Sequence, residues 1–142
     1  MAIKDGLRTL FLAQSSITSL CPPQTIDDIS EPGIFLNVVK QKFKPPHIVI
    51  RREGKNPNLT MDGYKRSNIE VECVAGTASD AAAIAKAVSD FFDPYKGAAG
   101  ASDYVDMVIW DDAVDSEEPE NSGLDQWRHK MTLKFQVTHH AI

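Results

Sequence analysis

Residues 64 to 94 read YKRSNIEVECVAGTASDAAAIAKAVSDFFDP, and this stretch joins a strand pattern to a helix pattern. In its first half, Ile69, Val71 and Cys73 alternate with polar residues, which is the period of a strand that buries one face. In its second half, apolar residues recur at three- and four-residue steps, the period of an amphipathic helix. The stretch therefore predicts a strand followed by a helix that packs on a sheet.

Both ends of this helix carry explicit signals. Thr77 or Ser79 can cap its N-terminus, and Asp80 in the first turn suits the helix dipole. Asp93 and Pro94 end it. The predicted apolar face consists of Ala81, Ile84, Ala85, Val88 and Phe91 or Phe92. Because small alanines allow close approach, we expect this helix to pack tightly on the sheet.

The segments before this stretch predict one further helix and two strands. Residues 3 to 20 have the spacing of an amphipathic helix, and residues 33 to 41 that of a strand. HIVIRRE at 47 to 53 is a second strand, which runs into the turn-forming segment GKNPNLTMDG at 54 to 63. We expect a hairpin with a long loop here.

The segments after it predict two more strands. Val105, Met107 and Ile109 alternate within a strand at 103 to 110, and the last strand begins near Trp127. That last strand is expected to turn one series inward: Trp127, His129, Met131, Leu133, Phe135 and Val137. The run between the two strands, 111 to 125, is expected to be a loop.

Together these elements predict an α+β fold, an antiparallel or mixed β-sheet of four to five strands with two helices packed on one face. The 142 residues suit a single domain spanning 1–142. Within it, residues 22–44 and 111–125 are expected to be long loops or assembly arms. Cys21 and Cys73 form no CxxC motif and no disulfide framework. We therefore expect Cys73 to be a buried thiol and the protein to fold in a reducing cytoplasm.

Charge is divided along the chain. Between residues 40 and 66 there are eight basic and two acidic residues, whereas the net charge of the whole chain is −5. Between residues 103 and 125 there are nine acidic residues and no basic one. The two segments are therefore complementary in charge and far apart in sequence.

Little in the chain favours catalysis or a bound cofactor. The acidic run lacks the residue order of a calcium loop, and the adjacent His139 and His140 of a strand would point to opposite faces. There is no GxSxG, HExxH, Walker or GxGxxG motif. We therefore expect that the protein is not an enzyme and that it has no cofactor and no metal site. We expect His129 to lie in the core or in an interface. No apolar run approaches a membrane span, so no membrane association is expected.

Nucleic-acid binding is a further hypothesis, because the basic segment contains two adjacent arginines. The sequence pI of about 5.3 and the lack of interleaved aromatic residues weigh against it. Two interpretations of the basic segment remain: it is a solvated strand face, or it forms a charged interface.

Three stretches resemble the tail completion or tail terminator proteins of long-tailed bacteriophages. They are PPHIVIRREG, the strand and helix of 64 to 92, and the closing QWRHKMTLKFQVTHH. Like this chain, those proteins have a Pro-led strand, a glycine near the turn, an alternating strand, an Ala-rich helix and a closing strand. The resemblance covers roughly residues 45 to 140; the acidic run and the segment before Pro45 depart from it.

The resemblance implies a structural virion protein, a minor tail protein that forms a ring, typically a hexamer, at the top of the tail tube. Such a ring ends tube polymerisation and joins the head-neck connector, while genome DNA passes through its channel without specific binding. Assembly is expected in the host cytoplasm. The candidate subunit-interface or channel residues are Arg51, Arg52, Lys55, Lys65, Arg66, Asp111, Asp112, Asp115, Glu117, Glu118 and Glu120.

Two alternatives stay open. One is another head-tail connector, neck or tail-associated protein of the same fold. The other is a metal-dependent hydrolase that uses the acidic run, which predicts a tight divalent-ion site and turnover lost when Asp111 and Asp112 are changed.

Overall fold

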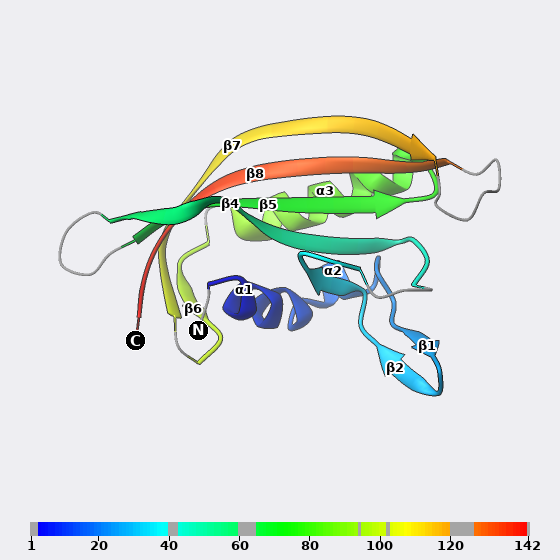
Figure 1. The fold of residues 1–142 in the computed structure, drawn as a ribbon, viewed down its shortest axis with the longest axis horizontal. Helices are drawn as coiled ribbons and strands as arrows, with labels where there is room; N and C mark the ends of the chain where they lie inside the picture. Colours follow the sequence, from blue (N-terminus) through cyan, green and yellow to red (C-terminus); the bar gives the residue numbers. More distant parts are fainter. Residues whose placement is uncertain are drawn as a thin grey trace.

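The structure, a computed structural model, describes residues 3–39, 43–59, 65–93, 95–101, 103–119 and 127–141 (Figure 1). Of these, residues 52–59, 65, 111–119 and 127–128 are described by their backbone alone. The helices are α1 (Ile3–Leu12), α2 (Ser15–Thr18) and α3 (Ala78–Phe92). The strands are β1 (Gln24–Ile26), β2 (Ile29–Glu31), β3 (Ile34–Leu36), β4 (His47–Leu59), β5 (Lys65–Ala75), β6 (Gly97–Ala99), β7 (Asp103–Pro119) and β8 (Trp127–Ala141).

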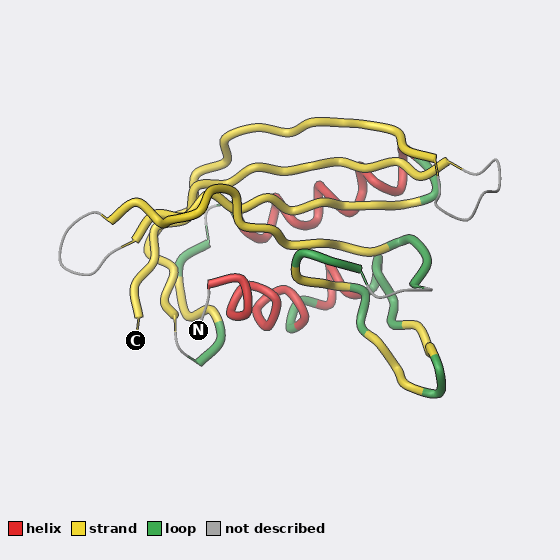
Figure 2. Tube along the Cα trace, in the orientation of Figure 1, coloured by secondary structure: helices red, strands yellow, loops and turns green. Residues whose placement is uncertain are grey.

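Six of these strands form one sheet in the order β3-β4-β5-β8-β7-β6. The pair β3 and β4 is parallel, and every other neighbouring pair in this sheet is antiparallel. The four long strands β4, β5, β8 and β7 run beside one another through its centre (Figure 2). The sheet is therefore mixed, with short strands covering only part of each edge.

The core lies between this sheet and the helices. Ile48 and Ile50 of β4 are buried, as are Ile69 and Val71 of β5 and Phe135 of β8. The ring of Phe92 from α3 lies edge-on to two other rings, with centroids 5.3 Å from that of Phe11 in α1 and 5.1 Å from that of Phe135. Helices α1 and α3 thus pack into one core on the same face of the sheet (Figure 1). We call the opposite face the outer face.

The predicted fold class is confirmed, although the sheet has six strands where four to five were expected. A separate two-stranded sheet, β1 with β2, adds to it. Helix α3 begins and ends as predicted: the Thr77 hydroxyl accepts a hydrogen bond from the backbone N–H of Asp80, and the helix stops at Phe92. Its predicted apolar face is buried at Ala81, Ile84, Ala85, Val88 and Phe92.

The helix predicted at 3 to 20 is wrong in its length. Helix α1 stops at Leu12, and Gln14 has extended backbone angles before the short helix α2 begins. The apolar spacing continues across the break, because Ile17 of α2 is fully buried as a continuous helix would also require. Periodicity therefore identified the buried residues here but not the interruption.

The segment 22–44, expected to be a long loop or arm, contains three short strands in its described part. Strand β3 is limited to Ile34–Leu36, shorter than the strand predicted at 33 to 41. The rings of Phe35 and Phe43 lie edge-on at 4.8 Å and, with Ile26, form a small separate apolar cluster. The β1–β2 hairpin projects away from the sheet (Figure 1).

The long strands extend further than predicted. Strand β4 continues to Leu59 through most of the expected turn at 54 to 63, and β7 continues to Pro119 through much of the expected loop at 111 to 125. Strand β4 pairs with β5, and β7 pairs with β8, both antiparallel, so the strand pairing of the expected β4–β5 hairpin is present. Cross-strand pairing overrode the local turn and charge signals, since strand propensity depends strongly on neighbouring strands.

The alternation predicted for Val105, Met107 and Ile109 is interrupted in β7. The register with β8 shifts between Val105 and Met107, which marks a bulge or irregularity. Val105 and Val108 are buried, whereas Met107 and Ile109 are exposed. The extra residue exchanges the faces of the residues that follow it, because side chains alternate with a period of two, and a second register shift occurs between Trp110 and Asp112.

Candidate subunit interface

The outer face of the sheet carries a ladder of opposite charges across three strands. Arg51 Nε of β4 donates a 3.0 Å hydrogen bond to Oε2 of Glu72 in β5. On the other side, Lys130 Nζ of β8 lies 3.6 Å from Oε1 of Glu72, and Lys134 Nζ lies 3.9 Å from Oε1 of Glu70. These residues share a face because their positions on the strands have the same parity. Charge thus alternates from β4 to β5 to β8.

The strand register extends this alternation to β7. Arg51 is opposite Glu70, Glu70 is opposite Lys134, and Lys134 is opposite Asp112. One row of positions across the four long strands therefore reads basic, acidic, basic, acidic. Its two ends are a basic residue on β4 and an acidic residue on β7.

The structure places the predicted basic and acidic residues toward opposite edges of the sheet. Arg51, Arg52 and Lys55 lie on β4, and Lys65 and Arg66 begin β5. The acidic candidates on β7 are Asp111, Asp112, Asp115, Glu117 and Glu118. Glu120 lies outside the described residues. Strand β8 separates β7 from Lys65 and Arg66, and β5 and β8 together separate it from the basic residues of β4.

Strand β7 also exposes large apolar side chains next to its acidic run. Met107, Ile109 and Trp110 are 49%, 46% and 45% exposed. Ile109 is opposite Gln136 on the outer face, while Trp110 is opposite the inward-facing Phe135. Apolar side chains therefore emerge on both faces of β7 within four residues. A neighbouring chain that pairs with this strand would cover apolar side chains on both faces.

A groove of about 350 Å³ lies on the helical face beside β7. Trp110, Met131 and Leu133 line it from the strands, and Ala85 and Ser89 line it from α3. Helix α3 packs on β5 and β8. The groove therefore lies at the side of α3 that borders β7, where the helix no longer covers the inner face of the sheet.

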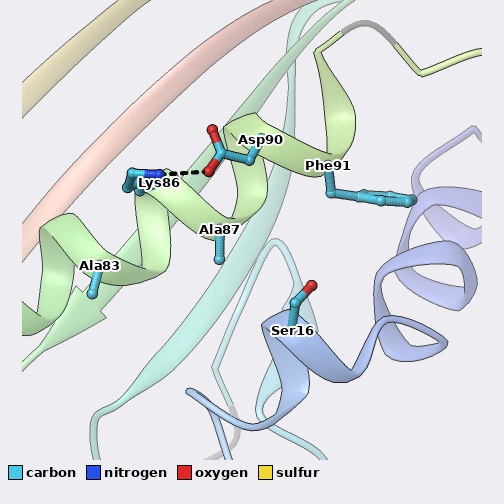
Figure 3. Close-up of a pocket in the computed structure, with 6 residues that line it drawn as sticks. All are labelled: Ser16, Ala83, Lys86, Ala87, Asp90 and Phe91. Atoms are coloured by element: carbon cyan, nitrogen blue, oxygen red, sulfur yellow. Dashed lines mark hydrogen bonds and ion pairs between the residues drawn. The ribbon is translucent and has the colours of Figure 1, made fainter.

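A second groove, of about 510 Å³, runs between α2 and α3 (Figure 3). Ser16 borders it on α2; Ala83, Ala87 and Phe91 border it on α3. Its charged groups are Lys86 and Asp90, whose Nζ and Oδ2 atoms are 2.8 Å apart in an ion pair along the helix. The pair satisfies both charges locally, so the groove presents mainly small apolar side chains.

The described residues offer little catalytic chemistry. No three His, Cys, Asp or Glu side chains among them gather to hold a metal ion, and no described helix is long and apolar enough to cross a membrane. Cys21 and Cys73 are buried free thiols, as expected for Cys73. Burial raises the pKa of Cys21 to about 12 and also raises that of Cys73, which favours the unreactive protonated form.

Sequence reasoning missed the buried pair Ser67 and His139. The Ser67 Oγ and His139 Nε2 atoms are 2.8 Å apart, and both residues are almost fully buried. The inward alternation of the last strand, continued by one more step from Val137, would have placed His139 in the core. The exposed residues of β7 were missed because the bulge after Val105 carries no clear sequence signal.

The comparisons with known proteins identify a shared fold. No protein-family model matches the chain. No curated protein matches it either. Among solved structures, the chain is similar to a chain of the virion of a native gene transfer agent (GTA) particle. The TM-score is 0.61 at 14% sequence identity, over 98% of this chain and 92% of that chain. The two chains therefore share one fold over nearly their whole lengths.

Proposed function

We propose that this protein is a structural subunit of a phage-like virion, and that it acts as the tail terminator. In this proposal, copies form a ring, a hexamer in the simplest case, that caps the tail tube and stops its polymerisation. The ring joins the tube to the head-neck connector, and genome DNA passes through the central channel without specific binding. Assembly takes place in the host cytoplasm before the ring enters the virion.

The observation that carries the proposal is the fold shared with a chain of a virion particle over 98% of this protein. Fold alone does not determine function, so surface features must add to it. Here the basic and acidic groups lie toward opposite edges of one sheet, with exposed apolar side chains beside the acidic group. A ring needs two different, complementary surfaces on each subunit, because its contacts are heterologous.

The experiment is to measure the mass of the purified protein by light scattering across a range of concentrations, with negative-stain images of each species. Purified tail tubes are then added. We expect rings with a central hole, bound at one end of each tube, and tubes that no longer lengthen when tube protein is supplied.

The same experiment distinguishes a tail terminator from a neck component of the virion. A protein that leaves tube ends bare but binds the head connector is a neck component of the same fold. A protein that stays monomeric and binds neither partner is not a tail terminator. Tubes of unchanged growth rate in the presence of bound rings would also refute the terminating role.

A further inference from the structure

Two backbone edges of the six-stranded sheet are open along much of their length. Strand β6 pairs with β7 only at Asp103–Val105, and from Met107 to Pro119 no described strand lies beyond β7. At the other side, β3 pairs with β4 only at Ile48–Ile50. From Arg51 to Leu59 the outer edge of β4 likewise has no neighbouring strand within the described parts of the chain. Open edges carry N–H and C=O groups that can pair with another strand.

The two open edges lie at the same level of the sheet. The row that joins Arg51 to Glu70, Lys134 and Asp112 crosses the open part of β4 at one end and the open part of β7 at the other. A second copy placed beside the first, without a shift along the strands, would therefore bring its β4 edge to the β7 edge of its neighbour. The alternating row would continue, because Asp112 would meet Arg51 of the next copy.

Strand direction favours the same arrangement. Neighbouring long strands are antiparallel from β4 through β5 and β8 to β7, so β4 and β7 run in opposite directions. A neighbouring copy in the same orientation would thus present β4 antiparallel to β7. This repeats the pairing found inside the subunit, and it is a heterologous contact of the kind from which rings are built when the rotation between copies closes.

The charges of the two edges favour pairing of β7 with β4 over a two-fold contact in which two identical edges pair. Residues 107–119 contain five acidic residues and no basic one, while residues 51–59 contain three basic residues and one acidic residue. Pairing β7 with β7, or β4 with β4, would place like charges together, which destabilises opposed strands. Pairing β7 with β4 places opposite charges together. The exposed Met107, Ile109 and Trp110 would then become covered by the neighbouring strand.

We propose that the β7 edge of one copy pairs with the β4 edge of a second copy of this chain, joining the six-stranded sheets into one continuous sheet around the ring. The contact involves Met107–Asp112 and Arg51–Asn56. It stops before Pro57, which has no N–H to donate. Irregular edges resist indiscriminate pairing, and both strands have a register shift at this level, so complementary charge selects the partner. This inference rests on the proposed ring.

The test introduces cysteines at the two ends of the row. The double variant Arg51→Cys/Asp112→Cys is assembled and oxidised, then separated on denaturing gels without reductant. We expect a ladder of disulfide-linked chains up to the size of the ring. Each single variant should give none, and a mixture of the two should give linked dimers. Disulfide dimers of Asp112→Cys alone would overturn the proposal, because they report β7 against β7.

Charge reversal provides a second, independent readout. Variant Asp111→Lys/Asp112→Lys makes the contact segment Met107–Asp112 basic, like its partner segment on β4, and variant Arg52→Glu/Lys55→Glu makes the segment Arg51–Asn56 acidic, like its partner on β7, so neither should assemble alone. An equimolar mixture should restore rings, because each variant supplies the edge that the other needs. Lys96→Glu, an exposed residue outside both edges, is the matched control and should assemble normally. Unchanged thermal unfolding of each variant shows that it folds.

The outcomes separate this inference from the proposed function. Rings that form and cap tubes, but give no ladder and are insensitive to charge reversal, overturn the edge pairing and leave the terminator proposal standing. A ladder and mutual rescue in a protein that does not bind tubes support the edge pairing and overturn the terminator proposal.

Discussion

Arg51 Nε on β4 donates a 3.0 Å hydrogen bond to Oε2 of Glu72 on β5. The Glu72 side chain is only 13% exposed, so its carboxylate depends on protein partners more than on water. Lys130 of β8 approaches its other oxygen at 3.6 Å, and the one carboxylate therefore links three strands. The comparison case is the ion pair of Lys86 and Asp90 on α3, in which both side chains are mostly exposed.

Replacing Glu72 by Gln should lower the free energy of unfolding by about 1–2 kcal/mol, since a hydrogen-bonded, largely buried charge is worth more than a surface pair. Urea denaturation measures the change. Asp90→Asn is the control and should leave the urea midpoint within experimental scatter, because exposed pairs contribute little. Equal effects of the two substitutions would contradict the importance of burial.

Removing the ring of Phe92 should destabilise the protein strongly. Phe92 is fully buried and contacts the rings of Phe11 and Phe135 edge-on, so Phe92→Ala leaves a cavity between α1, α3 and β8. We expect a loss of about 3–5 kcal/mol in the free energy of unfolding, measured by chemical denaturation. Val38→Ala, at a site 76% exposed, should change it little. A loss below 1 kcal/mol for Phe92→Ala would mean that the helices do not meet as described.

Gly6 of α1 should reject a side chain that the helix alone would favour. Ala is preferred to Gly in a helix by about 1 kcal/mol. A Cβ at Gly6, however, would collide with the backbone carbonyl of Ala99 in β6, which cannot move aside cheaply. We therefore expect Gly6→Ala to lower the free energy of unfolding by about 1–2 kcal/mol.

Gly76→Ala is the matched control for this close approach. A Cβ at Gly76 meets no atom within 4 Å, and its backbone conformation suits other residues. The substitution should raise the free energy of unfolding by roughly a few tenths of a kcal/mol, because Ala restricts the unfolded chain more than Gly does. The opposite signs of the two glycine substitutions are the result to look for in denaturant titrations. A stabilising Gly6→Ala would refute the contact of α1 with β6.

The buried thiols should make stability fall at alkaline pH. Below an ordinary Cys pKa of 9.0 the thiols are protonated in both the folded and unfolded states and add no pH dependence. Above it, the unfolded chain releases protons that the folded chain keeps until about pH 12 for Cys21. Each buried thiol should then lower the free energy of unfolding by about 1.4 kcal/mol per pH unit.

Comparing wild type with Cys73→Ala isolates one thiol from lysines and tyrosines that titrate in the same range. Urea titrations at several pH values between 8 and 11 should give a shallower pH dependence for the variant, whatever its stability at neutral pH. Parallel pH profiles for the two proteins would show that Cys73 ionises as readily in the folded state as in the unfolded one.

Local periodicity anticipated the elements whose signals lie within a few residues. The strand around Val71 and the capped helix from Ala78 were predicted because alternation, an N-terminal hydroxyl and a terminating Pro occur in one short stretch. The inward series of β8 at Leu133, Phe135 and Val137 was predicted for the same reason and is buried. The register shift after Val105 was not predictable, because a bulge depends on the partner strand.

The sequence by itself determined the α+β class, the buried faces of α3, β5 and β8, and the division of charge between a basic and an acidic segment. These follow from the order of apolar and charged residues along the chain, which is a local property. Only the tertiary structure decided that β4 and β7 have edges without a neighbouring strand among the described residues. It also decided that Arg51 and Asp112 lie at the two ends of one row across the sheet, and that Met107 and Ile109 are exposed. Strand order and register join residues far apart in sequence, so no local pattern can specify them.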